Sequence, residues 1–329
     1  MASSIFLSII IPAYNNPHEL EGLCQSISYQ LIENIEVIVI DDASKIPLKS
    51  LVEKFSFKYI YKENSGPAAS RNLGASLAKG KYLLFLDSDT VMPEGMLDKI
   101  LLIGKEEDLD ICSIFYSEKS NNPGVGQQFK AYFDYFYNCY NKPEGETLSL
   151  QGSSCLFKKN VFKELGGWAE NFEEPTIENE EFAFRIEKQG KYKIIYKPNL
   201  NISHNFQDLK GLLKTIFRRS IIWTQLKLSK TVGFDGLVRT KLTAFYTLQS
   251  IFLIFLSILS PFYFLNKYLF LICLLIYIFG NFKFYLFLHE KCDLLNFLKY
   301  AFAQYLFHLF VSTGAIIGVL TFKAHKFKY

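Results

Sequence analysis

Short apolar runs alternate with segments of helical periodicity over roughly the first 110 residues, and this alternation constrains the fold more than any other feature of the sequence. The apolar runs are β-branched and continuous, as expected for strands that are buried on both faces. Strands that alternate with helices predict βαβ units and a mainly parallel sheet, so the fold class expected here is α/β. The strands are predicted at 5–11, 35–40, 59–61 and 82–86, and the helices at 19–30, 48–55, 68–78 and 93–103.

Aspartates directly follow two of the predicted strands. Asp41 and Asp42 end the second strand, and Asp87 and Asp89 follow the fourth. In parallel sheets, ligands bind at the carboxyl ends of the strands. Two carboxylates in i, i+2 positions there suit a hard divalent cation, whose remaining ligands are usually substrate phosphates. The sequence therefore favours a metal site at Asp87 and Asp89 over a pair of solvated turn aspartates.

Apolar residues are spread unevenly along the chain. The whole sequence is 50% hydrophobic, and its 32 Phe residues concentrate after residue 241, where charged residues become rare. A membrane-spanning helix needs about 20 apolar residues. The charge-free stretches 242–266 and 300–322 meet that length, and 268–282 does so only if it extends toward 288. We therefore predict two or three membrane helices within 242–329, with lysines near the C-terminus favouring a cytoplasmic end.

Charge and cysteine content exclude several other classes of protein. A dispersed net charge of +4 does not suggest a nucleic-acid partner. The six cysteines form neither a CxxC pair nor a Cys/His cluster, so we expect reduced thiols and no zinc site. The N-terminus lacks a basic region and a cleavage site, so we expect no signal peptide. These features predict a cytoplasmic catalytic region attached to the inner or plasma membrane by a multi-pass C-terminal region.

The rest of the chain falls into three regions with different sequence patterns. Residues 113–150 are predicted to be irregular and rich in aromatic side chains, with packing favoured over acceptor or bilayer contact for 129–140. Residues 152–204 return to an α/β pattern. Residues 208–230 form a basic amphipathic stretch, as expected for a helix at a membrane interface.

Several short motifs together resemble family 2 glycosyltransferases of the GT-A fold. They occur in the family's order and spacing, over about the first 205 residues. The resemblance implies a Rossmann-like GT-A domain at 1–205, followed by basic interface helices at 206–241 and an α-helical membrane region at 242–329. The matching segments are SIIIPAYN (8–15), VIVIDDAS (37–44), ENSGPAASRNLGASLAKGKYLLFLDSD (63–89), LGGW (165–168) and ENEEFAFR (178–185).

The resemblance also implies a binding site for a nucleotide-diphosphate sugar. Asp42 would bind the base, Arg71 would lie beside the base and the phosphates, and Asp87 would contact the ribose or the metal. Asp89 would hold Mg²⁺ or Mn²⁺ on the diphosphate, where the metal assists the leaving group. The alternatives are a turn or helix-capping role for Asp42 and a surface position for Arg71. Further donor-binding residues on matching motifs are Pro12, Tyr14 and Ser88.

An inverting transfer to a hydroxyl group needs a general base, and the expected one is replaced here. Aligned on Phe182 and Arg185, the family's Asp becomes Asn179, whose amide cannot accept the proton. Glu178 and Glu180 are then the predicted catalytic residues. Alternatively, the acceptor is a lipid phosphate that needs no base, or these glutamates only begin a helix.

Four further residues match the family more loosely. Arg219 and Trp223 resemble an element near the donor diphosphate, although a basic helix on anionic lipid fits them equally. His204 is a candidate third metal ligand, for which a structural role is the alternative. Gly152 would let the backbone pass close to the donor, or simply begin a strand.

Together these features predict a membrane-anchored, metal-dependent inverting glycosyltransferase that takes a nucleotide-diphosphate sugar, with UDP favoured. Its acceptor would be a glycan or a lipid-linked glycan in surface polysaccharide synthesis. One alternative is a polyisoprenyl-phosphate glycosyltransferase, and another is an inactive GT-A-like membrane scaffold. A sugar nucleotidyltransferase would need a glycine-rich loop after the first strand, where the sequence instead has Pro12 to Asn16.

Overall fold

The computed structural model describes residues 5–122, 124–170, 178–229, 248–253, 256 and 264–322. The chain divides into two compact units, each described here by itself. The first comprises residues 1–121 and 137–205, and the second comprises 122–136 and 206–329.

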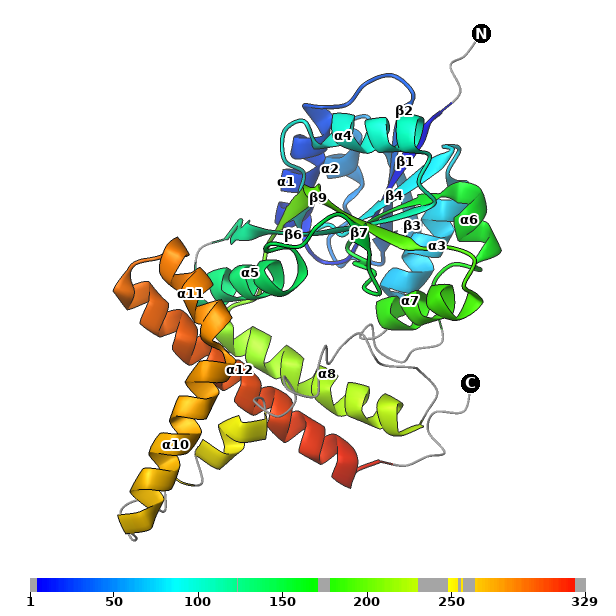
Figure 1. Ribbon diagram of the computed structural model, residues 1–329. Helices are drawn as coiled ribbons and strands as arrows, with labels where there is room; N and C mark the ends of the chain where they lie inside the picture. The colour runs from blue at the N-terminus through cyan, green and yellow to red at the C-terminus, as the bar shows by residue number, and fades with distance from the viewer. Residues whose placement is uncertain are drawn as a thin grey trace. The chain divides into compact units, whose positions relative to one another are not determined.

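A nine-stranded sheet forms the centre of the first unit, in the order β3-β2-β1-β4-β8-β6-β9-β5, with β7 paired to β9 (Figure 1). The four strands β3, β2, β1 and β4 are parallel, whereas β8 runs antiparallel to both β4 and β6. The prediction of a mainly parallel sheet therefore holds for the N-terminal half, and the complete sheet is mixed. The strands are β1 (Leu7–Ala13), β2 (Ile35–Asp42), β3 (Lys58–Lys62), β4 (Tyr82–Leu86), β5 (Thr90–Val91), β6 (Ile111–Ser120), β7 (Gly145–Glu146), β8 (Ser154–Lys158) and β9 (Ile194–His204).

Helices cover both faces of this sheet (Figure 1). Side chains of α1, α2 and α4 join one buried cluster, and those of α3, α6 and α7 join the other. The helices of the first unit are α1 (Pro17–Ser28), α2 (Lys49–Glu53), α3 (Gly66–Leu77), α4 (Met96–Leu102) with a π-helical turn at Ile103–Glu107, α6 (Lys159–Glu164) and α7 (Glu178–Gln189).

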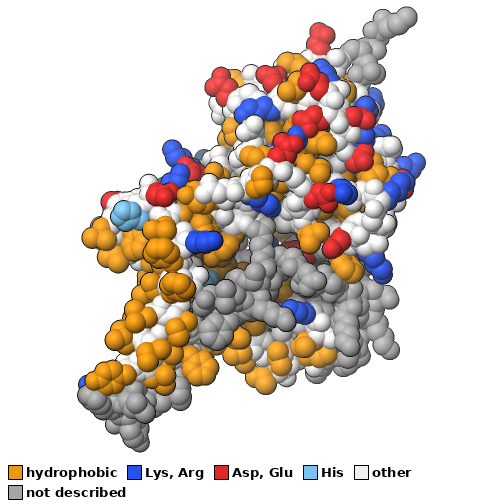
Figure 2. Space-filling model, in the orientation of Figure 1, with side chains coloured by type: hydrophobic (Ala, Val, Ile, Leu, Met, Phe, Trp, Pro, Cys, Tyr) orange, Lys and Arg blue, Asp and Glu red, His pale blue; other side chains and the backbone are white. Residues whose placement is uncertain are grey.

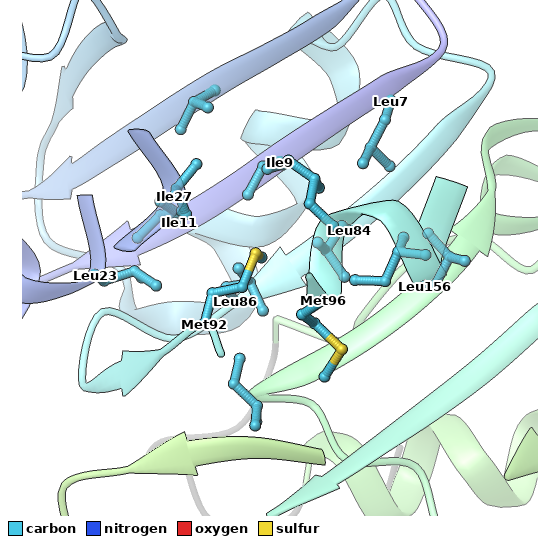
Figure 3. Close-up of a cluster of buried hydrophobic side chains, with 14 of the residues drawn as sticks. Leu7, Ile9, Ile11, Leu23, Ile27, Leu84, Leu86, Met92, Met96 and Leu156 are labelled. Atoms are coloured by element: carbon cyan, nitrogen blue, oxygen red, sulfur yellow. The ribbon is translucent and has the colours of Figure 1, made fainter. Parts of the chain in front are cut away.

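Alternate residues of β1 supply the two cores, because successive side chains of a strand point to opposite faces. Ile9 and Ile11 pack with α1, where Leu23 and Ile27 lie on one helical face (Figure 3). Ile10 belongs to the other core. Every residue of β1 is buried, which explains why its sequence is continuously apolar rather than alternating.

The prediction that 113–150 is irregular is wrong. Most of β6 and all of the 14-residue helix α5 (Val125–Asn138) fall in this range. The expectation that its aromatic residues serve packing is confirmed within the second unit. There, Phe133 contacts Phe284 and Phe307, with ring centroids 5.9 and 4.9 Å apart.

The described helices of the second unit include one that is long and apolar enough to cross a membrane, α12. A second span is counted only if α10 and α11, which bend by 64° at their junction, are taken together. Most of the predicted span 242–266 lies outside the described residues. Besides residues 125–136 of α5 and a helical segment at 248–253, the helices are α8 (Leu209–Ser229), α10 (Phe264–Gly280), α11 (Phe282–Lys291) and α12 (Leu294–Leu320).

Candidate active site

The carboxyl ends of β1, β2 and β4 meet at one edge of the sheet, and side chains connect the loops that follow them. Ala13 is level with Asp41 in the β1–β2 register. In the loop after β1, the backbone N–H of Asn15 donates to Ser44 Oγ at 3.0 Å. Asn16 Nδ2 donates to Ser88 Oγ at 2.6 Å, which joins this loop to the Asp87–Asp89 loop. The predicted donor-binding segments are therefore brought together in one connected set of loops.

Asp42 is buried and accepts hydrogen bonds at the start of α3. Its Oδ1 accepts from the backbone N–H of Ser65 at 3.0 Å, and its Oδ2 accepts from that of Gly66 at 2.8 Å. Lys62 Nζ is also bonded to Oδ1. These contacts show a turn-stabilising role for Asp42, which was the alternative considered from the sequence. A role in base binding stays a prediction.

Arg71 is buried against Asp87 rather than lying on a helix surface. Its Nη2 donates to Asp87 Oδ1 at 2.6 Å, and the guanidinium is 5.3 Å from the centre of the Trp168 ring. Glu178 Oε1 lies 3.8 Å from Nη1. Burial alone would lower the pKa of Arg71, but the carboxylates of Asp87 and Glu178 outweigh it and raise that pKa. Arg71 is therefore a permanent cation between two acidic groups.

The pKa values of Asp87 and Asp89 are shifted in opposite directions by their surroundings. Burial raises the pKa of Asp87, against the opposing effect of the Arg71 cation. For Asp89, burial also acts upward, but His204 reverses the effect and the pKa is lowered. His204 Nε2 lies 3.3 Å from Asp89 Oδ1, because Thr90 and His204 are paired in the β5–β9 ladder. His204 therefore lies beside Asp89, while its predicted role as a third metal ligand stays a prediction.

The donor set at this edge fits a divalent cation that is completed by substrate phosphates. Asp89 Oδ1 is buried beside the His204 imidazole, while 39% of the Asp89 side chain is exposed. Within the described residues, no three acidic, His or Cys side chains are grouped to hold an ion by themselves. One or two carboxylates plus substrate phosphates are the usual ligands of Mg²⁺ in enzymes that act on phosphates. Asp87 and Asp89 match that pattern, whereas a complete three-ligand site with His204 is not preformed.

Asn179 lies in the first turn of α7 and makes a structural contact. The indole Nε1 of Trp168 donates to Asn179 Oδ1 at 3.0 Å. The same amide fills the space beside Gly152, where an added Cβ would lie 1.8 Å from Oδ1. This contact gives Gly152 a third explanation, in addition to the two considered from the sequence.

The three glutamates around Asn179 are not equivalent. Glu181 forms two hydrogen bonds of 2.9 Å with Arg185 and is thereby committed to that side chain. Glu178 is buried beside Arg71, and Glu180 is half-buried. The structure thus brings Glu178, one of the two predicted catalytic residues, to the Arg71–Asp87 pair.

The remaining predicted residues have the following positions. Pro12 is buried in β1, and Tyr14 is 51% exposed in the loop that follows. Arg219 and Trp223 belong to α8 of the second unit, where Arg219 is exposed and Trp223 is half-buried. Their predicted contact with the donor diphosphate stays a prediction.

Sequence reasoning missed the residues that connect the loops. Asn16 contacts Ser88, and Ser153 accepts the backbone N–H of Asp87 at 2.9 Å through its carbonyl. Tyr116 and Ser153 hydroxyl oxygens lie 2.5 Å apart. The adjacent Asn15-Asn16 was a turn signal that could have indicated Asn16, but no local pattern indicates Tyr116 or Ser153.

Residues 8–166 match the model of Glycosyl transferase family 2. The glycosyltransferase GlyG of Streptococcus pneumoniae is 32% identical over 179 residues, covering 49% of this chain and 60% of that protein. The GalNAc(5)-diNAcBac-PP-undecaprenol beta-1,3-glucosyltransferase of Campylobacter jejuni is 25% identical over 259 residues, covering 73% of this chain and 82% of that protein. The alignments with the first curated relatives span 27%, 39% and 60% of those proteins.

Among solved structures, the chain is similar to the mannosyltransferase PcManGT from Pyrobaculum calidifontis in complex with GDP-Man and Mn²⁺. That likeness has a TM-score of 0.53 at 16% identity and covers 95% of this chain and 86% of the other. At this identity it shows the fold alone, and it confirms the predicted GT-A fold. The chain is therefore similar to glycosyl transferase family 2 over residues 8–166, which make up just under half of its length.

Proposed function

We propose that this protein is a membrane-attached, inverting hexosyltransferase that transfers a sugar from a nucleotide-diphosphate sugar, with UDP favoured, in surface polysaccharide synthesis. Its acceptor is a glycan or a lipid-linked glycan. The observation that carries the proposal is the cluster of Arg71, Asp87 and Glu178, with Asp89 beside it, at the strand ends of a domain similar to family 2. A charged cluster at this edge is where α/β sheets bind their ligands.

Arg71 positions the Asp87 carboxylate. One oxygen of Asp87 accepts the 2.6 Å hydrogen bond from Arg71, and 30% of the side chain remains exposed. The buried guanidinium therefore fixes the direction in which the carboxylate presents its other oxygen. Tyr14 and Ser88 lie on the same connected loops and are proposed to contact the donor, with Asp42 on its base.

Asp87 and Asp89 are proposed to hold Mg²⁺ or Mn²⁺, with His204 beside Asp89. When bound, the cation supplies positive charge to the departing nucleoside diphosphate. The ion pair between His204 and Asp89, which requires a protonated imidazole, favours the ionised form of Asp89, the form that ligates a cation. Of the proposed ligands, Asp89 is therefore the one whose loss should reduce metal-dependent activity most strongly.

Glu178 or Glu180 is proposed to accept the proton of the acceptor hydroxyl as the sugar carbon is attacked. Glu178 has the clearer geometry, because its carboxylate lies 3.8 Å from Arg71 Nη1 and thus next to the Asp87 pair.

A phosphate acceptor is the second candidate, and Asn179 favours it. The position that resembles the family's base carries an amide that is already bonded to Trp168. A lipid phosphate is ionised at neutral pH and can attack without a base. The Campylobacter relative is named for a polyprenol-linked acceptor, which supports a lipid-borne substrate in either case.

The second unit is proposed to attach the protein to the inner or plasma membrane, with the catalytic unit in the cytoplasm. Apolar side chains gather along α10 (Figure 2), where Leu271, Leu275 and Phe279 are 51%, 56% and 78% exposed. Large apolar side chains exposed together along one helix favour a protein or membrane contact. Among the described helices, only α12 and the bent α10–α11 pair are long and apolar enough to contribute to a multi-pass arrangement.

The proposal is tested with a panel of nucleotide sugars, by measuring hydrolysis and transfer with Mg²⁺, with Mn²⁺ and with EDTA. We expect turnover with a UDP-sugar that is lost in EDTA and in Asp89→Asn. Asp98→Asn, an exposed aspartate on α4, is the matched control and should retain turnover. Donor binding without any turnover across donors and acceptors would instead support an inactive scaffold.

The base is tested with Glu178→Gln and Glu180→Gln, with the exposed Glu187→Gln on the same helix as the control. We expect one of the first two to lower kcat by about 100-fold or more, as for loss of a general base. If neither variant lowers kcat while Asp89→Asn still abolishes transfer, the acceptor is a phosphate group and not a hydroxyl group.

A further inference from the structure

Helices α8 and α12 of the second unit pack with their backbones unusually close. An added Cβ on Gly314 would lie 2.6 Å from the carbonyl oxygen of Phe217, and one on Gly318 would lie 2.7 Å from that of Ile221. Glycines four residues apart lie on one face of a helix, which allows this approach. The two helices therefore form a single packed element.

The two helices run in parallel, and their alignment fixes which residues are level. Phe217 and Phe310 have ring centroids 6.3 Å apart, and Gln225 Nε2 donates to Thr321 Oγ1 at 3.0 Å. The C-terminal half of α12 is thus accompanied by α8 over its whole length. Any depth that this half of α12 reaches in a membrane is also reached by α8.

Exposed cations are distributed along α8. The first and last of them are 17 residues apart, which is about 26 Å at 1.5 Å per residue. That distance is close to the thickness of the hydrocarbon core, about 30 Å. These exposed residues are Lys210, Lys214, Arg218, Arg219 and Lys227.

Four of the apolar residues that α12 exposes lie on the opposite side from α8. Ile316 and Leu320 follow Gly314 and Gly318 by two residues each, a rotation of about 200° around the helix axis. Leu298 and Phe302 precede Ile316 and Leu320 by 18 residues, about five complete turns, and so share their face. All four are between 42% and 77% exposed. The helix pair therefore exposes an apolar stripe on the side of α12 away from α8, while the exposed cations of α8 are spread around that helix.

We propose that α12 lies in the plane of an anionic membrane surface and does not cross the bilayer. The apolar stripe of α12 contacts the acyl chains, while α8 is stacked on its other side. The cations of α8 remain in water, where they are attracted to anionic headgroups. This inference rests on the membrane attachment proposed above and is independent of the sugar chemistry.

A spanning α12 would place the α8 cations in hydrocarbon. Charged side chains at the centre of a bilayer are costly and normally face a protein interior or a water-filled cavity. The five cations named above are exposed instead. Length and composition alone allow α12 to cross, but its neighbour makes an in-plane position the lower-energy arrangement.

The experiment uses the full-length protein in sealed membrane vesicles of known orientation and a membrane-impermeant maleimide. Cys273 and Cys292, the half-buried thiols, are first replaced by alanine. Single cysteines are then introduced as Lys299→Cys and Thr321→Cys, exposed positions near the two ends of α12, and as Tyr29→Cys, which reports the side of the catalytic unit. We expect Lys299→Cys and Thr321→Cys to be labelled from the same side.

Labelling of the two positions from opposite sides would overturn the in-plane arrangement and leave the proposed membrane attachment intact. Recovery of the protein outside the membrane fraction would overturn both. A fluorophore at Leu298→Cys, Leu309→Cys and Leu320→Cys gives an independent readout with lipid quenchers at different depths. Equal depths at the three positions support the in-plane arrangement, and a maximum depth at residue 309 contradicts it.

Discussion

Trp168 donates its indole N–H to Asn179 across 3.0 Å, at the position where the family resemblance leads one to expect an ionised aspartate. Asn179 in turn occupies the space beside Gly152. The substitution is therefore part of a packed contact between the Gly166–Trp168 turn and the first turn of α7. Any account of the catalytic base has to begin from this contact.

The first prediction concerns the stability of that contact. Asn179→Leu leaves the Trp168 N–H buried without an acceptor, which should cost about 1–3 kcal/mol of unfolding free energy. Asn179→Asp keeps an acceptor and should cost clearly less. Thermal unfolding of the three proteins in the same detergent checks this. Equal losses for Leu and Asp would show that the hydrogen bond contributes little.

The second prediction concerns the Arg71–Asp87 pair. Arg71→Met leaves the Asp87 carboxylate without its cation, and breaking a buried pair costs about 3–5 kcal/mol. The lower end of that range is expected because 30% of Asp87 is exposed. The exposed Lys49–Glu53 pair is the control, and Lys49→Ala should cost about 0–1 kcal/mol.

A double variant separates this explanation from simple loss of packing. Adding Asp87→Asn to Arg71→Met removes the uncompensated charge, so part of the lost stability should return. If the double variant is as unstable as the sum of the two single variants, the charge was not the cause.

The third prediction is a decrease in stability at alkaline pH. Burial raises the pKa of Cys24 and of Cys112 to about 12. An unfolded thiol titrates near 8.5, so above that pH the unfolded chain releases protons that the native protein retains. Each thiol should then lower the unfolding free energy by about 1.4 kcal/mol per pH unit until its native pKa is reached. Below pH 8.5 neither thiol makes the unfolding free energy depend on pH.

Denaturant unfolding at pH 7.5, 9 and 10 measures this effect, and Cys24→Ala should reduce the slope between pH 9 and 10. An identical slope in the variant would mean that Cys24 is accessible to hydroxide in the native protein.

The fourth prediction concerns the α8–α12 contact. Gln225→Cys and Thr321→Cys should be joined by a short bis-maleimide cross-linker, because Gln225 Nε2 and Thr321 Oγ1 lie 3.0 Å apart in the native protein. Gly318→Leu should abolish the cross-link, since its side chain would displace the α8 backbone at Ile221. Val319→Leu, at an exposed neighbouring position, is the control and should leave cross-linking unchanged.

The strands that carry the site could be predicted because their signal is local. β1, β2 and β4 are buried on both faces, so each reads as a short continuous apolar run, and the aspartates mark their ends. The mixed strand directions of the sheet were harder to predict from the sequence, because the direction of β8 between β4 and β6 depends on long-range pairing.

The partners of the site residues could not be predicted. The motif that contains Arg71 does not indicate which carboxylate its guanidinium meets, and Asp87 is 16 residues away on another element. In the same way, Asn179 was recognised as a departure from the family pattern, but its donor Trp168 was not. Helix α5 was missed because its aromatic residues read as an irregular cluster until their partners, more than 140 residues later, are known.

The assignment of residues 122–136 to the second unit has a practical consequence for anyone who wishes to isolate the catalytic unit. A single cut after residue 205 removes α11 and α12 but retains α5, whose Phe129, Phe133 and Phe136 then lose their aromatic partners. Such a fragment exposes aromatic side chains of α5 that pack against α11 and α12 in the intact chain, and these side chains favour aggregation. A soluble catalytic protein requires polar replacements on α5 as well as the truncation.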